Sequence, residues 1–150
     1  MTCDPHKLHI TASSSRFAVR SLLSELTDEL AEWGLDSSCV SIVELVTAEV
    51  LNNVIEHAFK FEDGKPFEVK AQWETDELTL EIIDRGLPMP GLQLPDTATG
   101  KRSSPEVDVP VEDLPEGGWG WFLIRDLTRE LSYLREENAN HLVIRMDAVA

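Results

Sequence analysis

Two neighbouring segments with strict alternation of apolar and polar residues constrain this chain more than any other feature. FEVKAQW (67–73) and ELTLEIID (77–84) both repeat with a period of two, which is typical of strands with one buried face. Only residues 74–76 separate them. Because so short a connection joins antiparallel neighbours, the two segments predict a β-hairpin and therefore a sheet built around it.

The second of these strands ends on a residue that does not fit a hydrophobic core. Leu78, Leu80 and Ile82 form the buried row, and Asp84 is the next residue in that row, with Gly86 just beyond. A buried carboxylate is unfavourable unless it is paired or hydrogen-bonded. A ligand with an amino donor, such as adenine, would supply the partner, and an ordinary Asp-Gly turn after the strand is the alternative.

The remaining patterns predict the elements that surround the hairpin. They are a strand at 7–12, a helix between the serines at 13–15 and Gly34, a helix over 37–59, a helix opened by the glycines at 117–120, and a closing hairpin of 130–135 and 141–146 across 137–140. Helices that are apolar on one side must cover a sheet. We therefore expect a single domain, 1–150, folded as an α/β two-layer sandwich (α+β) with a mixed, mostly antiparallel sheet covered on one face by helices.

Between the central hairpin and the third helix the periodic pattern disappears. Six of the eight prolines lie between residues 87 and 116. A loop of this length in a small domain is usually a functional lid or a disordered segment, so we predict a lid over about 87–117.

The charge of the chain limits the classes of partner. The net charge of −15 disfavours direct binding to nucleic acid and to anionic membranes, since both require a basic surface. The negative charge then serves either solubility alone or binding to a basic patch on a protein partner. Cys3 and Cys39 form no CxxC pair, and no run of 18 apolar residues is present, so a cytoplasmic protein is expected.

Two further clusters suggest a binding site. Glu49, Asn53 and His57 recur at i, i+4 and i+8 on the second helix and form a slowly drifting row, which can also be the wet stripe of an amphipathic helix. Gly118 and Gly120 stand where a helix begins, and free N–H groups there suit a polyphosphate, although a flexible hinge is the simpler alternative.

Taken in order along the chain, these motifs resemble those of a known family. AEVLNNVIEHAF (48–59) resembles the N-box, IIDRGLPMP (82–90) the first glycine box and EGGWGWFLIRDL (116–127) the second glycine box of the ATP-binding GHKL superfamily, which has the Bergerat fold. Within it, the chain is similar to the bacterial anti-sigma factor serine/threonine kinases. The resemblance implies ATP and Mg²⁺ as cofactors.

The resemblance also implies roles for individual residues of the N-box. Glu49 would act as general base toward a serine or threonine hydroxyl, and Asn53 would coordinate the Mg²⁺ that bridges the phosphates. His57 would lie at the edge of the nucleotide. Phosphoryl transfer needs such an acceptor for the proton and such a charge-neutralising metal.

The glycine boxes complete the nucleotide site that the resemblance implies. Asp84 would accept a hydrogen bond from the adenine amino group, and Gly86 would lie under the base. Gly118, Trp119 and Gly120 would hold the phosphates. Lys101 and Arg102 of the lid could reach phosphate. Family members often carry Gly-Thr before the final strand to help hold adenine, but here the run is Asn138-Ala139-Asn140. That contact is therefore open.

The function implied is that of a partner-switching kinase. It would phosphorylate a serine or threonine of a STAS-domain anti-sigma factor antagonist and would hold a sigma factor or another output protein. Arg20 occupies a position that the family often uses for partner contact, and family kinases are commonly homodimers. The alternatives are a histidine-kinase-like catalytic domain and a non-catalytic module that binds proteins under the control of ATP.

Overall fold

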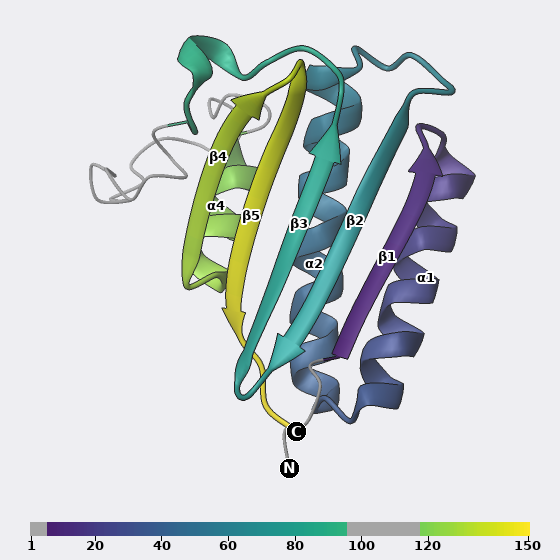
Figure 1. The fold of residues 1–150 in the computed structure, drawn as a ribbon, viewed down its shortest axis with the longest axis vertical. Helices are drawn as coiled ribbons and strands as arrows, with labels where there is room; N and C mark the ends of the chain where they lie inside the picture. Colours follow the sequence, from purple (N-terminus) through teal and green to yellow (C-terminus); the bar gives the residue numbers. More distant parts are fainter. Residues whose placement is uncertain (1–5, 96–117) are drawn as a thin grey trace.

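The fold consists of two layers, a twisted five-stranded sheet and three helices that cover one of its faces (Figure 1). The computed structural model describes residues 6–95 and 118–150. The elements are β1 (His6–Ser13), α1 (Arg16–Trp33), α2 (Ser37–Asn53), η1 (Val54–Ala58), β2 (Pro66–Glu74), β3 (Glu77–Asp84), η2 (Pro90–Leu92), α4 (Gly118–Leu127), β4 (Glu130–Glu136) and β5 (Ala139–Asp147). The predicted two-layer sandwich is confirmed.

The sheet has the strand order β1-β2-β3-β5-β4. All four neighbouring pairs are antiparallel, so within the described residues the sheet is more regular than the mixed sheet we expected. The predicted central hairpin is present, with Glu74 opposite Glu77 and Phe67 opposite Asp84. Strand β3 is thus flanked on both sides and forms the middle of the sheet.

The helices are held by local capping and by burial of their apolar faces. Ser15 caps α1 through a bond from Ala18 N to its Oγ at 3.0 Å, and Gly34 ends the helix with a φ of 97°, a left-handed conformation that favours glycine. Asp36 caps α2 in the same way. Both predicted helix starts and the predicted glycine stop are confirmed.

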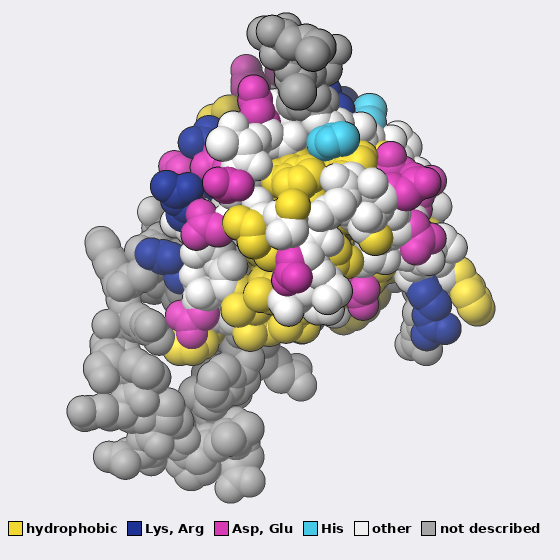
Figure 2. Space-filling view, turned by 90° about the horizontal axis from the view of Figure 1, so that it is seen from below, with side chains coloured by type: hydrophobic (Ala, Val, Ile, Leu, Met, Phe, Trp, Pro, Cys, Tyr) yellow, Lys and Arg dark blue, Asp and Glu magenta, His cyan; other side chains and the backbone are white. Residues whose placement is uncertain are grey.

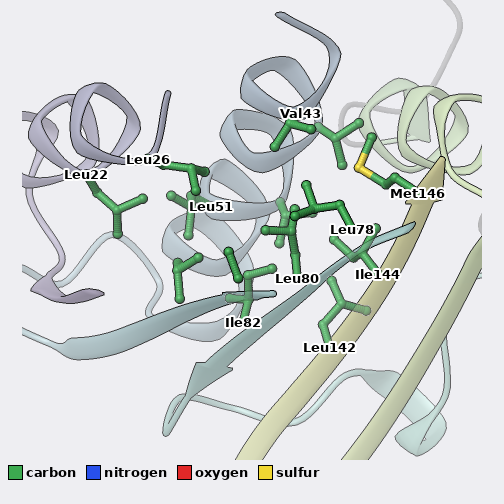
Figure 3. Packing of buried hydrophobic residues seen from close by; sticks show 14 of the residues in the cluster. Leu22, Leu26, Val43, Leu51, Leu78, Leu80, Ile82, Leu142, Ile144 and Met146 are labelled. Carbon is green, nitrogen blue, oxygen red and sulfur yellow. The ribbon is translucent and has the colours of Figure 1, made fainter. Parts of the chain in front are cut away.

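The hydrophobic core lies between the helices and the sheet (Figure 3). Leu26 of α1, Leu51 of α2 and Leu80 of β3 belong to this core, and all three are fully buried. Burying one such side chain contributes roughly 1.5–3 kcal/mol. The core therefore fixes how α2 lies across the middle of the sheet, and α2 carries most of the predicted site.

The second helix does not continue to residue 59 as an α-helix. It changes at Val54 into the π-helical turn η1, in which Phe59 N donates to Val54 O at 2.9 Å. A π-turn carries one extra residue between hydrogen-bonded groups, so side chains beyond Asn53 leave the i, i+4 row. π-Turns inside helices are found frequently at functional sites.

The closing hairpin is tighter than the sequence pattern predicted. Glu136 pairs with Ala139, so the loop contains only Glu137 and Asn138, with φ values of 52° and 63°. Positive φ at both positions is the signature of the two-residue hairpin turn that matches strand twist. Strand β5 consequently begins two residues earlier than expected and includes Asn140.

One helical stretch among the described residues, Ser37–Ala58, is long and apolar enough to cross a membrane by length and composition alone, with a mean hydropathy of 1.4. Core helices of domains meet the same criterion. In this fold the stretch lies behind the sheet between α1 and α4, and its buried residues include Val43, Val46 and Val50 (Figure 1).

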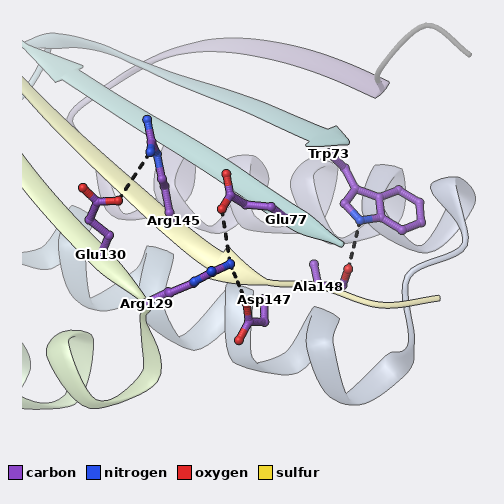
Figure 4. Close-up of polar contacts among 7 residues, drawn as sticks. All are labelled: Trp73, Glu77, Arg129, Glu130, Arg145, Asp147 and Ala148. Atoms are coloured by element: carbon purple, nitrogen blue, oxygen red, sulfur yellow. Dashed lines mark hydrogen bonds and ion pairs between the residues drawn. The ribbon is translucent and has the colours of Figure 1, made fainter. Parts of the chain in front are cut away.

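The end of the molecule opposite the predicted site combines apolar and acidic surface. Seen from that end, hydrophobic atoms lie between acidic side chains that are spread around the rim (Figure 2). His6 stacks on Trp33 and Trp73 with ring centroids 5.2 and 5.5 Å apart. Trp73 Nε1 also donates to Ala148 O at 3.1 Å, which ties the C-terminal residues to β2 (Figure 4).

Candidate functional site

The structure brings two of the predicted motifs together at the start of α4. A β-carbon built on Gly120 would lie 3.1 Å from Oε2 of Glu49 and 3.5 Å from Nδ2 of Asn53. A side chain at position 120 would therefore press against the Glu49 carboxylate and touch the Asn53 amide. Glycine at this position lets α4 approach the polar row of α2, so residues 49 and 120, far apart in sequence, border the same space.

This space is a cavity of about 430 Å³. Its lining consists of Glu49, Asn52, Asn53, Ile55, Glu56, Phe61 and Gly120. The carboxylate of Glu49 makes no hydrogen bond or ion pair with the residues that the structure describes, and it is only half buried. A free carboxylate at the wall of a cavity can accept a proton from a hydroxyl group that enters it.

Asn53 provides the evidence that a polar ligand belongs in this cavity. Its side chain is buried, with 9% of its surface exposed, and Nδ2 has no hydrogen-bond partner within the described structure. Buried polar groups are normally satisfied. Because a 180° rotation of an amide exchanges oxygen and nitrogen without changing its shape, Asn53 can offer an oxygen to a cation or an N–H to a phosphate.

The residues present fit Mg²⁺ in one particular manner. Over residues 6–95 and 118–150 no group of three His, Cys, Asp or Glu side chains could hold a metal ion. Mg²⁺ often takes only one or two protein oxygens and completes its octahedral shell with phosphates and water. The amide of Asn53 suits that role, with phosphates and water supplying the remaining ligands.

His57 does not join this group. It follows the π-turn, its side chain is 53% exposed, and it lines neither of the two cavities discussed here. Its Nε2 lies 3.9 Å from Oε2 of the neighbouring Glu56. The π-turn takes it out of the row that the sequence predicted for Glu49, Asn53 and His57, and its placement at the nucleotide edge stays a prediction.

Asp84 is buried at the end of β3, as its position in the alternating pattern predicted, with 4% of its surface exposed. Its Oδ1 accepts two hydrogen bonds, from Gly86 N at 2.9 Å and from Asn140 Nδ2 at 2.8 Å. Neither donor is charged. No hydrogen bond from the described residues reaches Oδ2, so this oxygen can accept a bond from a ligand.

Burial raises the pKa of the Asp84 carboxyl above its ordinary value of 3.8. The hydrogen bonds from Asn140 and Gly86 and the more distant charges of Arg135 and His141 act in the opposite direction, and burial outweighs them. A buried carboxylate of this kind is stabilised by one more hydrogen-bond donor. The amino group of a ligand can supply that donor.

Gly86 is required by the fold itself. A β-carbon at this position would lie 2.5 Å from Ala58 O, a distance that no side chain tolerates. Leu87 N donates to the same carbonyl at 2.8 Å. The first glycine box therefore packs against the end of η1, and this backbone contact is enough to require glycine at position 86. Its place under the base stays a prediction.

Sequence reasoning missed Asn140, which completes the surroundings of Asp84. Its register places it opposite Asp84 on β3 and opposite Arg135 on β4. Its Nδ2 donates to Asp84 and to Leu87 O, each at 2.8 Å. Its Oδ1 accepts from Tyr133 and, at 3.1 Å, from Arg135.

All four hydrogen-bonding positions of the Asn140 amide are thus in use, which fixes its orientation. The amide lies at the start of the final strand, where the expected Gly-Thr pair is missing. The predicted loop is two residues longer than the observed turn, so this residue lies outside the predicted strand. The signal that could have found it is the even-numbered apolar row of β5, which leads from Met146 through Leu142 to position 140.

Several predicted residues fall outside the described part of the chain. Of the lid predicted over about 87–117, residues 96–117 are not described, and Lys101 and Arg102 lie within that range. Gly118 and Trp119 belong to the first turn of α4, so the second glycine box forms the beginning of the helix instead of a separate loop. Trp121, two residues further along, is buried in the core.

This fold and these motifs define an ATPase domain of the histidine kinase type, and comparison with known proteins agrees. The model of the histidine kinase-like ATPase domain family matches residues 12–146. The chain belongs to this family. Membership carries the expectation that the domain binds ATP.

Individual relatives narrow the comparison. The chain is 27% identical over 101 residues to the serine-protein kinase RsbW of Bacillus mycoides (strain KBAB4), and 28% identical over 103 residues to that of Bacillus thuringiensis subsp. konkukian (strain 97-27). Each match covers 67% of this chain and 60% of the relative.

A solved structure shares the fold. It contains the RsbU and RsbW domains of Rv1364c from Mycobacterium tuberculosis, with a TM-score of 0.62 and 18% identity. The match covers 95% of this chain and 32% of the other.

Proposed function

We propose that this chain is an ATP-dependent serine/threonine protein kinase of the anti-sigma factor type. The observation that carries the proposal is the meeting of Glu49, Asn53 and Gly120 around one cavity. This arrangement combines a carboxylate and a buried amide, both without a partner for their free atoms among the described residues, with the N-terminal turn of a helix. Phosphoryl transfer to a hydroxyl group needs a proton acceptor, charge neutralisation and a holder for the phosphates.

Each of these residues has a defined task in the proposed reaction. Glu49 accepts the proton of the serine or threonine hydroxyl as the oxygen attacks the terminal phosphate. The N–H groups at the start of α4 face the phosphates, where the helix dipole favours negative charge. Asn53 would hold Mg²⁺, which when bound neutralises charge between the phosphates.

The far end of the nucleotide site is proposed to lie at Asp84. Its Oδ2 accepts a hydrogen bond from the amino group of adenine, while Asn140 and Gly86 donate to Oδ1. The remaining predicted contacts, at His57, Gly118 and Trp119, belong to the same proposal. They would place the nucleotide between the first glycine box and the start of α4.

The proposed partners follow from the resemblance to the anti-sigma factor kinases and from the similarity to serine-protein kinases. The substrate would be a STAS-domain anti-sigma factor antagonist, and the protein held would be a sigma factor or another output protein. Arg20 is exposed on α1 and is the proposed partner contact. The net charge of −15 favours partners with a basic contact surface.

The test is a transfer assay with γ-labelled ATP, Mg²⁺ and a candidate STAS-domain protein. We expect label on a serine or threonine, and a loss of about a hundredfold or more in rate for Glu49→Gln, because general-base catalysis contributes about 10²–10⁴-fold. Glu44→Gln, an exposed substitution on the same helix, is the matched control and should leave the rate unchanged. Undiminished transfer by Glu49→Gln would refute the assignment of the base.

Acid treatment of the labelled product separates the proposal from its alternatives. Label on serine or threonine survives acid, whereas label on a histidine is lost, and the latter result would favour the histidine-kinase-like alternative. Titration calorimetry that shows ATP binding, together with no transfer to any STAS-domain protein, would favour the non-catalytic module.

A further inference from the structure

A second cavity of about 400 Å³ lies at the site end of the sheet, beside the first glycine box. Its lining consists of Ala58, Phe59, Lys60, Glu62, Lys65, Arg85, Gly86, Leu87, Pro88 and Arg135. None of these residues lines the cavity around Glu49 and Asn53. The two cavities therefore share no lining residue and border different residues of η1. Gly86 also donates to Asp84, so the second cavity adjoins the proposed adenine end.

The second cavity is basic in an otherwise acidic protein. It gathers four of the thirteen Lys and Arg residues of a chain with a net charge of −15. They come from three different places: Lys60 and Lys65 from the segment between η1 and β2, Arg85 from the end of β3, and Arg135 from β4. Tertiary structure, not a run of basic sequence, assembles this charge.

Most of this positive charge is not neutralised from within the described residues. Lys65 pairs with Glu62 at 3.1 Å. Lys60 and Arg85 are exposed and make no ion pair with the described residues. Arg135 donates from Nη1 to Gly86 O at 2.7 Å and to Asn140 Oδ1 at 3.1 Å, and both acceptors are uncharged.

Those two bonds also fix the guanidinium of Arg135 at the wall of the cavity. Among the described residues the lining carries four cations and one carboxylate, that of Glu62, so positive charges are in excess. A dianion would balance them. Leu87 and Pro88 add apolar surface to the same lining, which suits the carbon part of an ester.

We propose that this cavity is a binding site for a phosphate monoester, separate from the nucleotide site. Arg and Lys side chains that converge from several segments are the usual means of holding a phosphate dianion. The ligand can be a phosphoserine or phosphothreonine side chain of a protein, or a small phosphorylated molecule. Either source presents the same dianionic group, and the experiment below separates them.

The experiment is a titration of the full chain with O-phospho-L-serine followed by ³¹P NMR, repeated in the presence of saturating AMP-PNP. We expect binding that persists with AMP-PNP and is absent for L-serine. A serine-phosphorylated peptide and glycerol phosphate are the next probes. Preference for the peptide assigns the site to a protein ligand, and preference for glycerol phosphate assigns it to a small molecule.

The decisive variant is Lys60→Gln/Arg85→Gln, because both residues are exposed and unpaired within the described structure and their loss should not disturb the fold. Binding should weaken by about tenfold or more, the effect of losing charge-assisted contacts. The matched control is Lys7→Gln/Lys70→Gln, which removes the same charge from exposed positions on β1 and β2. The control should bind as the wild type does.

Three results would overturn the proposal. Equal weakening in both double variants would show that only the net charge matters. Displacement of phosphoserine by AMP-PNP would assign the cavity to the nucleotide site, and displacement by adenosine, which carries no phosphate, would assign it to the base. None of these results depends on whether the chain transfers phosphate, so the proposal and the proposed kinase activity stand or fall separately.

Discussion

Strand β3 begins and ends with a carboxylate, and its two ends behave in opposite ways. Glu77 starts the strand and faces a guanidinium in solvent, with Arg129 Nη1 3.5 Å from its Oε2. Asp84 ends the strand, is buried, and accepts bonds from neutral donors alone. The same backbone therefore presents one acid that is paired by charge and one that is not.

At the Glu77 end, opposite charges meet at the surface (Figure 4). Arg129 also lies 3.2 Å from Oδ1 of Asp147, and Arg145 lies 3.4 Å from Oε2 of Glu130. The side chains of Arg129 and Asp147 are 61% and 78% exposed. Water screens such pairs, so each contributes between about zero and 1 kcal/mol.

At the Asp84 end, the hydrogen bonds are buried or part-buried instead of exposed. The amide of Asn140 is used at all four positions, and it links Asp84 to Tyr133 and Arg135. If this end of the strand had only a structural role, a cationic side chain could pair directly with the buried carboxylate. Holding it with neutral donors instead keeps its capacity to bind one more donor, which distinguishes a binding end from a merely structural one.

The largest expected effect tests whether only one of the two carboxylates serves a ligand. We predict that Asp84→Ala weakens the binding of an ATP analogue about a hundredfold, or about 2.7 kcal/mol, because the analogue loses a charge-assisted hydrogen bond in a buried place. Glu77→Ala, at the other end of the strand, should bind normally. Titration calorimetry measures both, and equal affinity of wild type and Asp84→Ala would refute the adenine contact.

The second prediction compares the stability that each end contributes. Asn140→Ala should lower the free energy of unfolding by about 2 kcal/mol, because it removes one of the two donors to the buried Asp84 and the donor to Leu87 O. Arg129→Ala should cost less than about 1 kcal/mol, since its pairs are exposed. Urea unfolding measures both values. A larger loss for Arg129→Ala would reverse the comparison between the two ends.

The smallest effect concerns pH. Because the pKa of Asp84 is higher in the folded protein than its ordinary value of 3.8, the folded state binds more protons than the unfolded state between those two values. The wild type should therefore lose stability relative to Asp84→Asn as the pH rises above 3.8, by no more than about 1.4 kcal/mol per pH unit. Above the folded pKa the difference should become constant.

Urea unfolding of both proteins at a series of pH values follows this difference directly. Glu77→Gln serves as the comparison at the exposed end of β3. A wild-type protein that gains stability relative to Asp84→Asn with rising pH would show that the carboxylate is stabilised, not penalised, by its burial.

The fold could be predicted largely from the sequence because each part of it depends on local patterns. Alternation fixed the central hairpin and placed Asp84 in the buried row, and Ser15 and Gly34 marked the ends of α1. The apolar faces of the helices then required a sheet to cover. These signals lie within a few residues of one another, so one sequence is enough to detect them.

The arrangement of the site depends on long-range packing and on backbone details that the sequence does not show. The π-turn after Asn53 moves His57 out of its row, and the two-residue turn at 137–138 brings Asn140 next to Asp84. The π-turn changes the direction of the side chains that follow it, whereas the shorter turn extends β5 by two residues in the same row.

By itself, the sequence determined the order of the elements, the buried position of Asp84 and the family to which the motifs point. Only the tertiary structure decided which residues surround that carboxylate, that Gly120 meets Glu49 and Asn53, and that Gly86 is required by Ala58. It alone gathered Lys60, Lys65, Arg85 and Arg135 at one cavity. Periodicity is a property of neighbours along the chain, whereas these contacts join segments whose spacing is set by packing and register.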